Sequence, residues 1–146
     1  IIEIITSLRS FKNELDISPG SQVEISLANT SKETQSFFDK NKNVFMKLGR
    51  INKILISDID KSFASLVVKG EIYKIYFNED VDLNKVKDSL MIKRKKIISE
   101  MDKINSRLSN KNFADKAPKE IVDQEKSNFN KLEKDANKIK LTLESL

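Results

Sequence analysis

Four consecutive cations, Lys93-Arg94-Lys95-Lys96, are the residues of this chain best suited to chemistry, because Lys and Arg side chains bind the phosphates of a nucleic-acid backbone. Residues 83–107 hold eight basic side chains against three acidic ones, whereas residues 1–81 hold 11 of each and sum to zero. The net charge of +5 therefore belongs to one part of the chain. On its own, a basic run is more often a solvated helix face, and the charge asymmetry adds weight to the second interpretation, contact with a nucleic acid.

The chain has few of the residues that catalysis or metal binding would need. The sequence contains no His and no Cys, which removes the commonest general base, the commonest metal ligand and every disulfide or thiolate site. No nucleophile with an adjacent base is apparent. We therefore expect no catalytic residue, no metal and no cofactor in this chain, and a reducing, cytoplasmic setting. No apolar run reaches the length of a membrane span, so we expect no membrane contact.

The first 80 or so residues predict a small α+β domain. Apolar residues at helical spacing predict a helix that ends before Pro19: Ile1, Ile4, Ile5, Leu8, Phe11 and Leu15. A strand follows at residues 23–27, and a capping box at residues 30–33 starts a helix that breaks near Asn41 and ends at Gly49. Three further strands are predicted within residues 51–57, 63–69 and 71–77, the last two joined by a tight turn. We predict helices packed on a small antiparallel sheet.

From Val81 onward the pattern is helical. One apolar stripe runs through residues 83–108, and a second keeps a 3-4-3-4 spacing from Val122 to Leu146 with only Glu125 polar in it. This is the spacing of a coiled coil, with helices of roughly 25 residues and about 40 Å each. We predict a long antiparallel α-helical coiled-coil hairpin with helices at about 82–109 and 118–145 and a hinge at 110–117. We expect Glu125 to pair with a basic residue of the first helix.

Pairing between two chains is the alternative to this hairpin, because helices of this length could also pair with a second molecule. The two stripes are similar in length and a turn-compatible hinge separates them, which favours pairing within one chain. The alternative carries its own function: a structural adaptor that docks a protein partner or dimerises through its coiled coil.

The hinge resembles that of a known family. Residues 107–118 are Arg-Leu-Ser-Asn-Lys-Asn-Phe-Ala-Asp-Lys-Ala-Pro, followed by an acid-rich helix start at residues 119–125. This is similar to the C-terminal arm of bacterial-type valyl-tRNA synthetases, which carry a Lys-Leu-Ser-Asn-x-x-Phe-x-x-Lys-Ala-Pro hinge. Arg107 replaces the usual Lys, and Lys111 stands where an acidic residue is common. Residues 8–20 resemble the last helix of the family's anticodon-binding bundle and its exit.

The resemblance implies a domain plan and a function. Residues 1–19 would be the last helix of an anticodon-binding helical bundle, residues 20–80 a small α+β base domain and residues 81–146 a tRNA-binding arm. The chain would be the non-catalytic C-terminal part of a valine–tRNA ligase, holding the elbow of the tRNA. Its parent would use ATP, although the catalytic signatures of that class are not found here. The expected partners are tRNA and the rest of the synthetase chain, with the chain otherwise a monomer. The apolar stripe of the first helix would then be partly exposed.

Resemblance and charge together predict a set of tRNA-binding residues along the arm and at its tip. They are Lys93, Arg94, Lys95, Lys96, Lys103, Arg107, Lys111, Asn112 and Phe113. Four successive helical residues span about 300° of the circumference, so Arg94 falls on or beside the apolar stripe while the three lysines point outward. Phe113 either closes the end of the hairpin or stacks on an unpaired base. Asn112 either shapes the turn or bonds to RNA.

Overall fold

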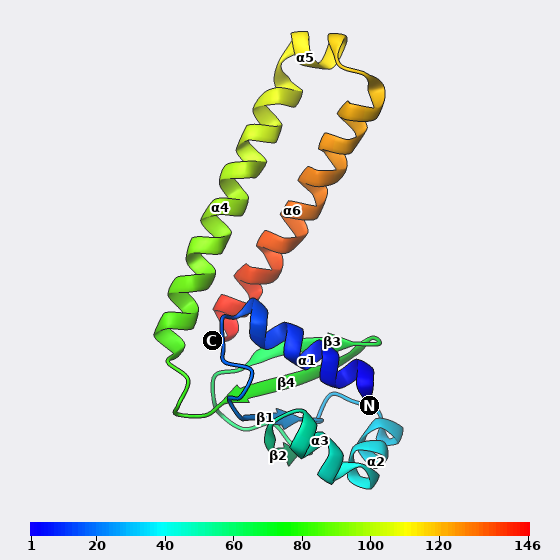
Figure 1. Ribbon diagram of the computed structural model, residues 1–146, viewed down its shortest axis with the longest axis vertical. Helices are drawn as coiled ribbons and strands as arrows, with labels where there is room; N and C mark the ends of the chain where they lie inside the picture. The colour runs from blue at the N-terminus through cyan, green and yellow to red at the C-terminus, as the bar shows by residue number, and fades with distance from the viewer. The chain divides into compact units, whose positions relative to one another are not determined.

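The computed structural model describes all 146 residues, which divide into two compact units. Residues 1–87 together with 145–146 form the first unit, called the base below, and residues 88–144 form the second, called the arm. The base combines helices with a sheet, and the arm is helical throughout (Figure 1). The predicted α+β class is confirmed.

Four strands form the sheet of the base, in the order β2-β1-β4-β3: β1 (Val23–Ser26), β2 (Ile51–Leu55), β3 (Ala64–Val68) and β4 (Glu71–Phe77). β4 pairs antiparallel with both β1 and β3, but β1 and β2 are parallel, so the prediction of an antiparallel sheet is wrong for this pair. The cause is the connection between them. Two helices, α2 (Lys32–Lys40) and α3 (Lys42–Leu48), separate β1 from β2, and a helical crossover returns the chain in its original direction.

The start of α2 depends on a strand that is distant in sequence. The capping residue is Ser31, whose Oγ accepts a hydrogen bond from the Thr34 backbone N–H at 3.1 Å. The carboxylate that completes the cap belongs to Glu71 of β4, not to Glu33: it accepts from the Ser31 N–H at 2.7 Å and from Thr34 Oγ1 at 2.5 Å. The hydrogen bond from Thr34 and then that from Ser31 hold the pKa of Glu71 below its ordinary value. The cap therefore ties α2 to the sheet.

Breaks in the chain fall where the sequence predicts them. Asn41 separates α2 from α3, and its side-chain amide donates to the Phe37 carbonyl at 2.9 Å. The hairpin between β3 and β4 turns on Lys69 and Gly70, which have φ of 51° and 78°. A two-residue turn with positive φ at both positions matches the right-handed twist of the strands.

The helix α1 (Ile2–Glu14) packs within the base. Four residues of its apolar stripe are buried: Ile5, Leu8, Phe11 and Leu15. The Phe11 ring stacks on that of Phe77 with a centroid distance of 6.4 Å. We expected this stripe to be partly exposed, but the base covers most of it and only Ile1 and Ile2 at the helix start stand open. The reason is that burying the apolar sheet face that carries Phe77 is favourable, and α1 packs against that face. The assignment of residues 1–19 to a helical bundle stays a prediction.

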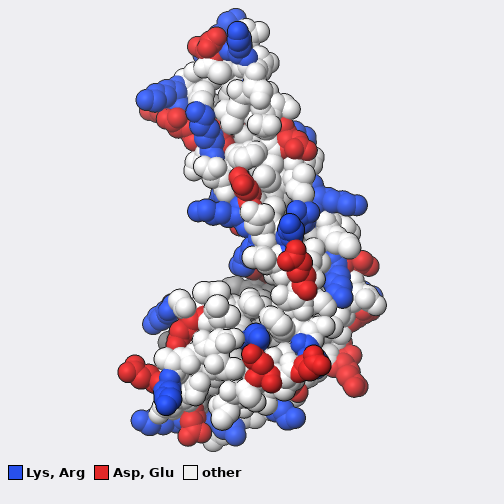
Figure 2. Space-filling view, turned by 180° about the vertical axis from the view of Figure 1, so that it is seen from behind, with Lys and Arg blue, Asp and Glu red and all other residues white.

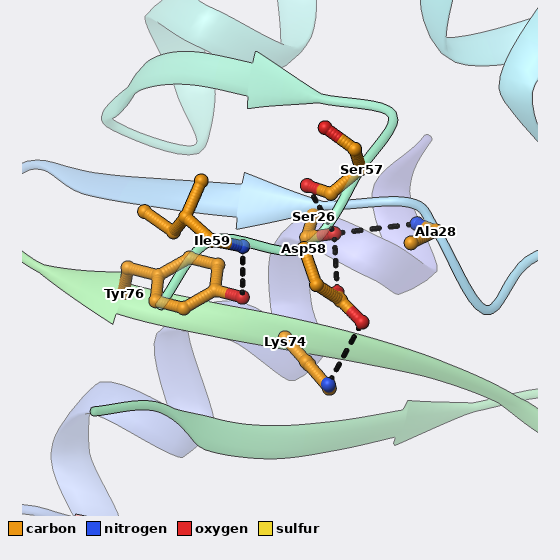
Figure 3. A network of polar contacts seen from close by, with 7 residues as sticks. All are labelled: Ser26, Ala28, Ser57, Asp58, Ile59, Lys74 and Tyr76. Atoms are coloured by element: carbon orange, nitrogen blue, oxygen red, sulfur yellow. Dashed lines mark hydrogen bonds and ion pairs between the residues drawn. The ribbon is translucent and has the colours of Figure 1, made fainter. Parts of the chain in front are cut away.

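The loop between β2 and β3 covers part of the opposite face of the sheet, around Tyr76, while Val67 and Ile72 on that face stay exposed. Asp58 in this loop accepts a hydrogen bond from Ser26 Oγ at 3.0 Å and forms an ion pair with Lys74 at 2.9 Å (Figure 3). The Ile59 backbone N–H donates to the hydroxyl of the buried Tyr76 at 3.3 Å. The hydrogen bond from Lys74 and that from Ser26 keep the pKa of Asp58 below its ordinary value. We interpret this network as structural, because each polar group in it forms a hydrogen bond or an ion pair with another group of the base.

The arm is an antiparallel helical hairpin, as predicted. α4 (Leu83–Ser109) leads into it, α6 (Lys119–Ser145) runs back beside α4, and the short helix α5 (Lys111–Lys116) joins them (Figure 1). The bounds lie within one or two residues of the predicted ones. The sequence did not reveal that the hinge is itself helical, with Asn110 Oδ1 accepting from the Asn112 N–H at 3.0 Å. No helix of the chain combines the length and apolar character needed to cross a membrane.

Replacing Tyr73 by Phe should remove part of the alkaline sensitivity of the base. Burial, reinforced by the nearby Glu71 carboxylate, raises the pKa of Tyr73 to about 12. Because the folded-state pKa exceeds the unfolded value, this group stabilises the fold below pH ~10, and that contribution is lost as pH rises toward 12. Between about pH 9 and about pH 11 the loss should be about 1.3 kcal/mol. Urea unfolding of both proteins across this range measures it. Parallel pH curves for Tyr73→Phe and the original chain would contradict the assignment.

Candidate nucleic-acid interface

The predicted cations of α4 fall on different sides of the helix. Lys96, Lys103 and Arg107 recur at intervals of seven and four residues, so they form one row, and all three are exposed. Glu100 is the acidic residue within that row. Lys95 lies on the other side, in a row where Asp88 and Asp102 stand seven residues before and after it. The first row is therefore the more basic of the two.

A groove runs along the arm beside the row of Lys96, Lys103 and Arg107, with a volume of about 560 Å³. Lys103 and Arg107 line it from α4, and Lys131 and Asn128 line it from α6. Ile104 and Leu132 supply apolar lining. Three carboxylates also reach it, so the groove carries both charges: Glu100, Glu125 and Asp135. The side of the arm that bears this groove is called the groove side below.

Arg107 and Glu125 join the two helices across the groove. Arg107 Nη2 lies 3.0 Å from Glu125 Oε2, which confirms the expected pairing of Glu125 with a basic residue of the first helix. The contact is an ion pair without hydrogen-bond geometry, because Glu125 Oε2 is buried and accepts no hydrogen bond. About half of the Arg107 side chain stays exposed (52%), against 19% for Glu125. Arg107 can therefore hold Glu125 and still face a ligand.

Lys93 is less open than the sequence predicted, whereas Arg94 lies at its predicted position. Both are half-buried, whereas Lys95 and Lys96 are exposed. Arg94 occupies a position of the apolar stripe, four residues after the buried Leu90 and three before Ile97, and its Nε is buried without a hydrogen-bond partner. The prediction that Arg94 lies on the stripe is confirmed, but Lys93 does not point fully outward. We expect these two side chains to contribute less to a ligand contact than Lys96 and Lys103.

The predicted tip residues lie together on α5. Lys111 and Asn112 are exposed and Phe113 is half-buried. The Asn112 backbone N–H belongs to the helix cap, which accounts for the turn-shaping role of the Asn110 side chain. The Asn112 side chain itself stands open to solvent, as does the ammonium of Lys111.

Charges on the arm are interspersed. Figure 2 shows Lys and Arg side chains along the arm with Asp and Glu side chains between them, and no large uniform patch on the face drawn. The positive excess comes from α4, with eight basic and three acidic residues, since α6 carries six of each. No group of three or more acidic side chains gathers in a way that could hold a metal ion. The arrangement suits repeated single contacts with a polyanion more than one concentrated anion site.

Lys131 and Asn128 are candidate residues that sequence reasoning missed. Both line the groove from α6, where they stand three residues apart with Asp135 four residues farther. The signal was present as a row of polar residues beside the second apolar stripe. Assigning that row to the same side as Lys103 required the antiparallel register of the two helices, which periodicity alone does not supply.

Comparison with known proteins agrees with this arrangement. Residues 82–146 match the family model of the valyl tRNA synthetase tRNA binding arm. This segment is similar to that arm. The chain is also 50% identical over 146 residues to the valine–tRNA ligase of Pelagibacter ubique, with all of the chain covered. It is 30% identical to the valine–tRNA ligase of Aquifex aeolicus over 99% of the chain, and 36% identical to that of Prochlorococcus marinus over 85%.

The match to these relatives is confined to one part of them. The chain spans 17% of the length of the Pelagibacter valine–tRNA ligase, 12% of the Aquifex protein and 14% of the Prochlorococcus protein. It corresponds to a C-terminal region of the valine–tRNA ligases. The valyl tRNA synthetase arm family accounts for α4, α5 and α6, and the full-length relatives extend the similarity through the base.

Replacing Glu125 by Leu should stabilise the arm. The change completes the apolar stripe of α6 and removes a buried carboxylate oxygen that accepts no hydrogen bond. Replacing a buried ion pair by apolar side chains is often neutral or stabilising, and Arg107 is half-exposed and can be solvated without its partner, so we expect a gain of about 1 kcal/mol. Amide hydrogen exchange in α6 measures it, with slower exchange expected. Glu133→Leu, at an exposed position of the same helix, is the matched control and should leave exchange unchanged. Faster exchange in Glu125→Leu would show that the ion pair with Arg107 holds the arm together.

Proposed function

We propose that this chain is the non-catalytic, tRNA-binding C-terminal part of a valine–tRNA ligase, and that the groove side of its arm contacts the sugar-phosphate backbone of the tRNA. The observation that carries the proposal is the placement of Lys103, Arg107 and Lys131 around one groove, within a segment that matches a tRNA binding arm. Activity as a ligase that uses ATP would belong to the longer protein of which the chain is a part.

The physical case rests on the way a polyanion is bound. Each Lys or Arg that neutralises a phosphate releases condensed counterions, so several spaced cations give an affinity that depends on salt more than on sequence. Lys96, Lys103 and Arg107 are spaced over eleven residues, or about 16 Å of helix at ~1.5 Å per residue. Consecutive phosphates of one strand lie several ångströms apart, so this row can meet more than one. Folded RNA is recognised largely by shape and by such backbone contacts.

The tip extends this contact surface. Lys111 offers a further cation, the Asn112 amide can bond to ribose or to a base edge, and Phe113 offers a ring for an unpaired base. By resemblance to the synthetase family, the surface reached would be the elbow of the tRNA. Arg94 and Lys93 then act mainly within the arm, because their side chains are half-buried.

Charge reversal on the groove side tests the proposal. The variant Lys96→Glu/Lys103→Glu/Lys131→Glu should weaken binding of a tRNA transcript by more than about 2 kcal/mol and reduce the salt dependence by about 0.7–0.9 per lost phosphate contact. Fluorescence anisotropy at several salt concentrations measures both quantities. The melting temperature should change little, since all three side chains are exposed.

A matched variant distinguishes the effect of the groove side from the effect of net charge. Lys95, Lys126 and Lys140 are exposed, and the helical period places them opposite the groove. Reversing these three changes the net charge equally but should affect tRNA binding much less. Equal losses in the two variants would show a diffuse attraction without a preferred side. Unaltered affinity in both, together with a concentration-dependent dimer in sedimentation, would favour the structural adaptor.

A further inference from the structure

A second group of cations gathers in the base, where three strand ends meet. Val23 at the start of β1 pairs with Ile51 at the start of β2 and with Phe77 at the end of β4. Arg50 directly precedes β2, and its carbonyl accepts a hydrogen bond from the Val23 N–H at 3.0 Å. α1 brings two more cations, Arg9 and Lys12, to the same turn. None of these three residues belongs to the arm.

Hydrogen bonds fix the cations from α1 at this turn. Arg9 Nη2 donates to the Leu48 carbonyl at 3.4 Å, and Lys12 Nζ donates to the Gly49 carbonyl at 3.4 Å and to the Ser21 carbonyl at 2.7 Å. Two successive carbonyls of the chain thus hold two cations, and Arg50 follows as the next residue. The three positive groups converge on one turn from two separate elements.

The backbone of the turn has little freedom to move. A Cβ at Gly49 would lie 2.7 Å from the Phe45 carbonyl oxygen, closer than real contacts allow. Arg50 has φ of 53°, the left-handed conformation that residues with a side chain adopt at a cost. The close approach at Gly49 and the left-handed Arg50 backbone define the path of the chain at this turn, and the Arg50 side chain is exposed there.

The charges at the turn are not balanced. Lys12 is only 2% exposed, and its ammonium donates hydrogen bonds to backbone carbonyls. Burial, then Arg50 and Arg9, lower the pKa of Lys12, and Asp80 acts in the opposite direction. Two neighbouring cations and one carboxylate thus act on the Lys12 ammonium, although residues 1–81 as a whole are neutral. Gathering like charges around a buried ammonium is unfavourable unless an anion relieves it.

We infer that Arg9, Lys12 and Arg50 form an anion site in the base that binds a backbone phosphate of the tRNA. The two exposed guanidinium groups, which suit the geometry of phosphate oxygens, make the contact. Lys12 is a positioning residue. Its ammonium donates hydrogen bonds to the Ser21 and Gly49 carbonyls, and its charge adds to the positive potential at the site. The identity of the ligand rests on the proposed function of the arm, whereas the site itself rests on the contacts of the base.

The test removes the two exposed charges in the 146-residue chain. Arg9→Gln/Arg50→Gln should weaken binding of a tRNA transcript by roughly three- to tenfold and lower the salt slope by about 0.7–0.9 per contact. The control Lys32→Gln/Lys40→Gln removes the same charge from exposed positions of α2 and should leave the affinity within about twofold of the original. Circular dichroism checks that each variant retains its melting temperature within a few degrees.

A second probe reports on the site without RNA. Titration with inorganic pyrophosphate should shift the NMR signals of the Arg9 and Arg50 guanidinium groups in the original chain, and no such shift should occur at Arg94, whose half-buried side chain acts mainly within the arm. Unchanged tRNA affinity in the double variant together with no pyrophosphate shift overturns the inference and leaves these cations as a cap of the α3 carbonyls. A pyrophosphate shift without an effect on tRNA affinity overturns the assignment to RNA.

The two proposals fail in different ways. If the groove-side variant binds tRNA weakly while Arg9→Gln/Arg50→Gln binds it fully, only the anion site of the base is refuted. If the double variant loses affinity while the groove-side variant does not, the base is the principal contact and the assignment to the arm fails. If the original chain binds no tRNA, both assignments to tRNA fail.

Discussion

The burial of two narrow apolar stripes against each other is the constraint on which the arm depends. Helices in proteins take most of their stability from packing an amphipathic face, and in the arm the mutual contact of α4 and α6 supplies that packing. A two-helix hairpin buries its stripe only in part: most stripe residues are half-buried, and Leu90, Ile104 and Ala136 are the buried ones of the arm. This contact also decides which cations share a side. Without it, Lys103 and Lys131 would belong to separate rods.

Two polar residues interrupt the apolar stripes of the arm. Arg94 and Glu125 take positions that an apolar residue would fill, and each keeps a buried polar atom without a hydrogen bond. Polar residues in a coiled-coil seam lower stability and can fix register and pairing. The ion pair of Glu125 with Arg107 exists only in the observed antiparallel register. We therefore interpret Glu125 as a residue that selects one alignment of the helices at some expense in stability.

The sequence predicts what is local and periodic. The helices of the arm, the strands, the break at Asn41 and the turn at Gly70 follow from spacing and from the conformations those residues allow. Three features depended on long-range packing instead. The parallel pairing of β1 and β2 needed the position of a crossover, and the cap of α2 used Glu71 from a distant strand in place of a neighbouring carboxylate. The cations Arg9 and Arg50 lie 41 positions apart, so no motif joins them. The sequence identified the candidate residues on α4, but it could not show which of them lie on the groove side of the arm.

The short helix at the hinge has a consequence for how such arms can change in length. α5 joins the end of α4 to the start of α6, and the apolar stripes of the two helices follow the heptad period. Insertion of seven residues into both helices would extend the reach by about 10 Å at ~1.5 Å per residue and return every outward side chain to its former bearing. An unmatched insertion of three or four residues would instead rotate the distal half, carrying the tip away from whatever surface it meets. The length of the arm and the direction of its tip can thus be changed separately. Whole heptads change the length, and fractions of a heptad change the direction.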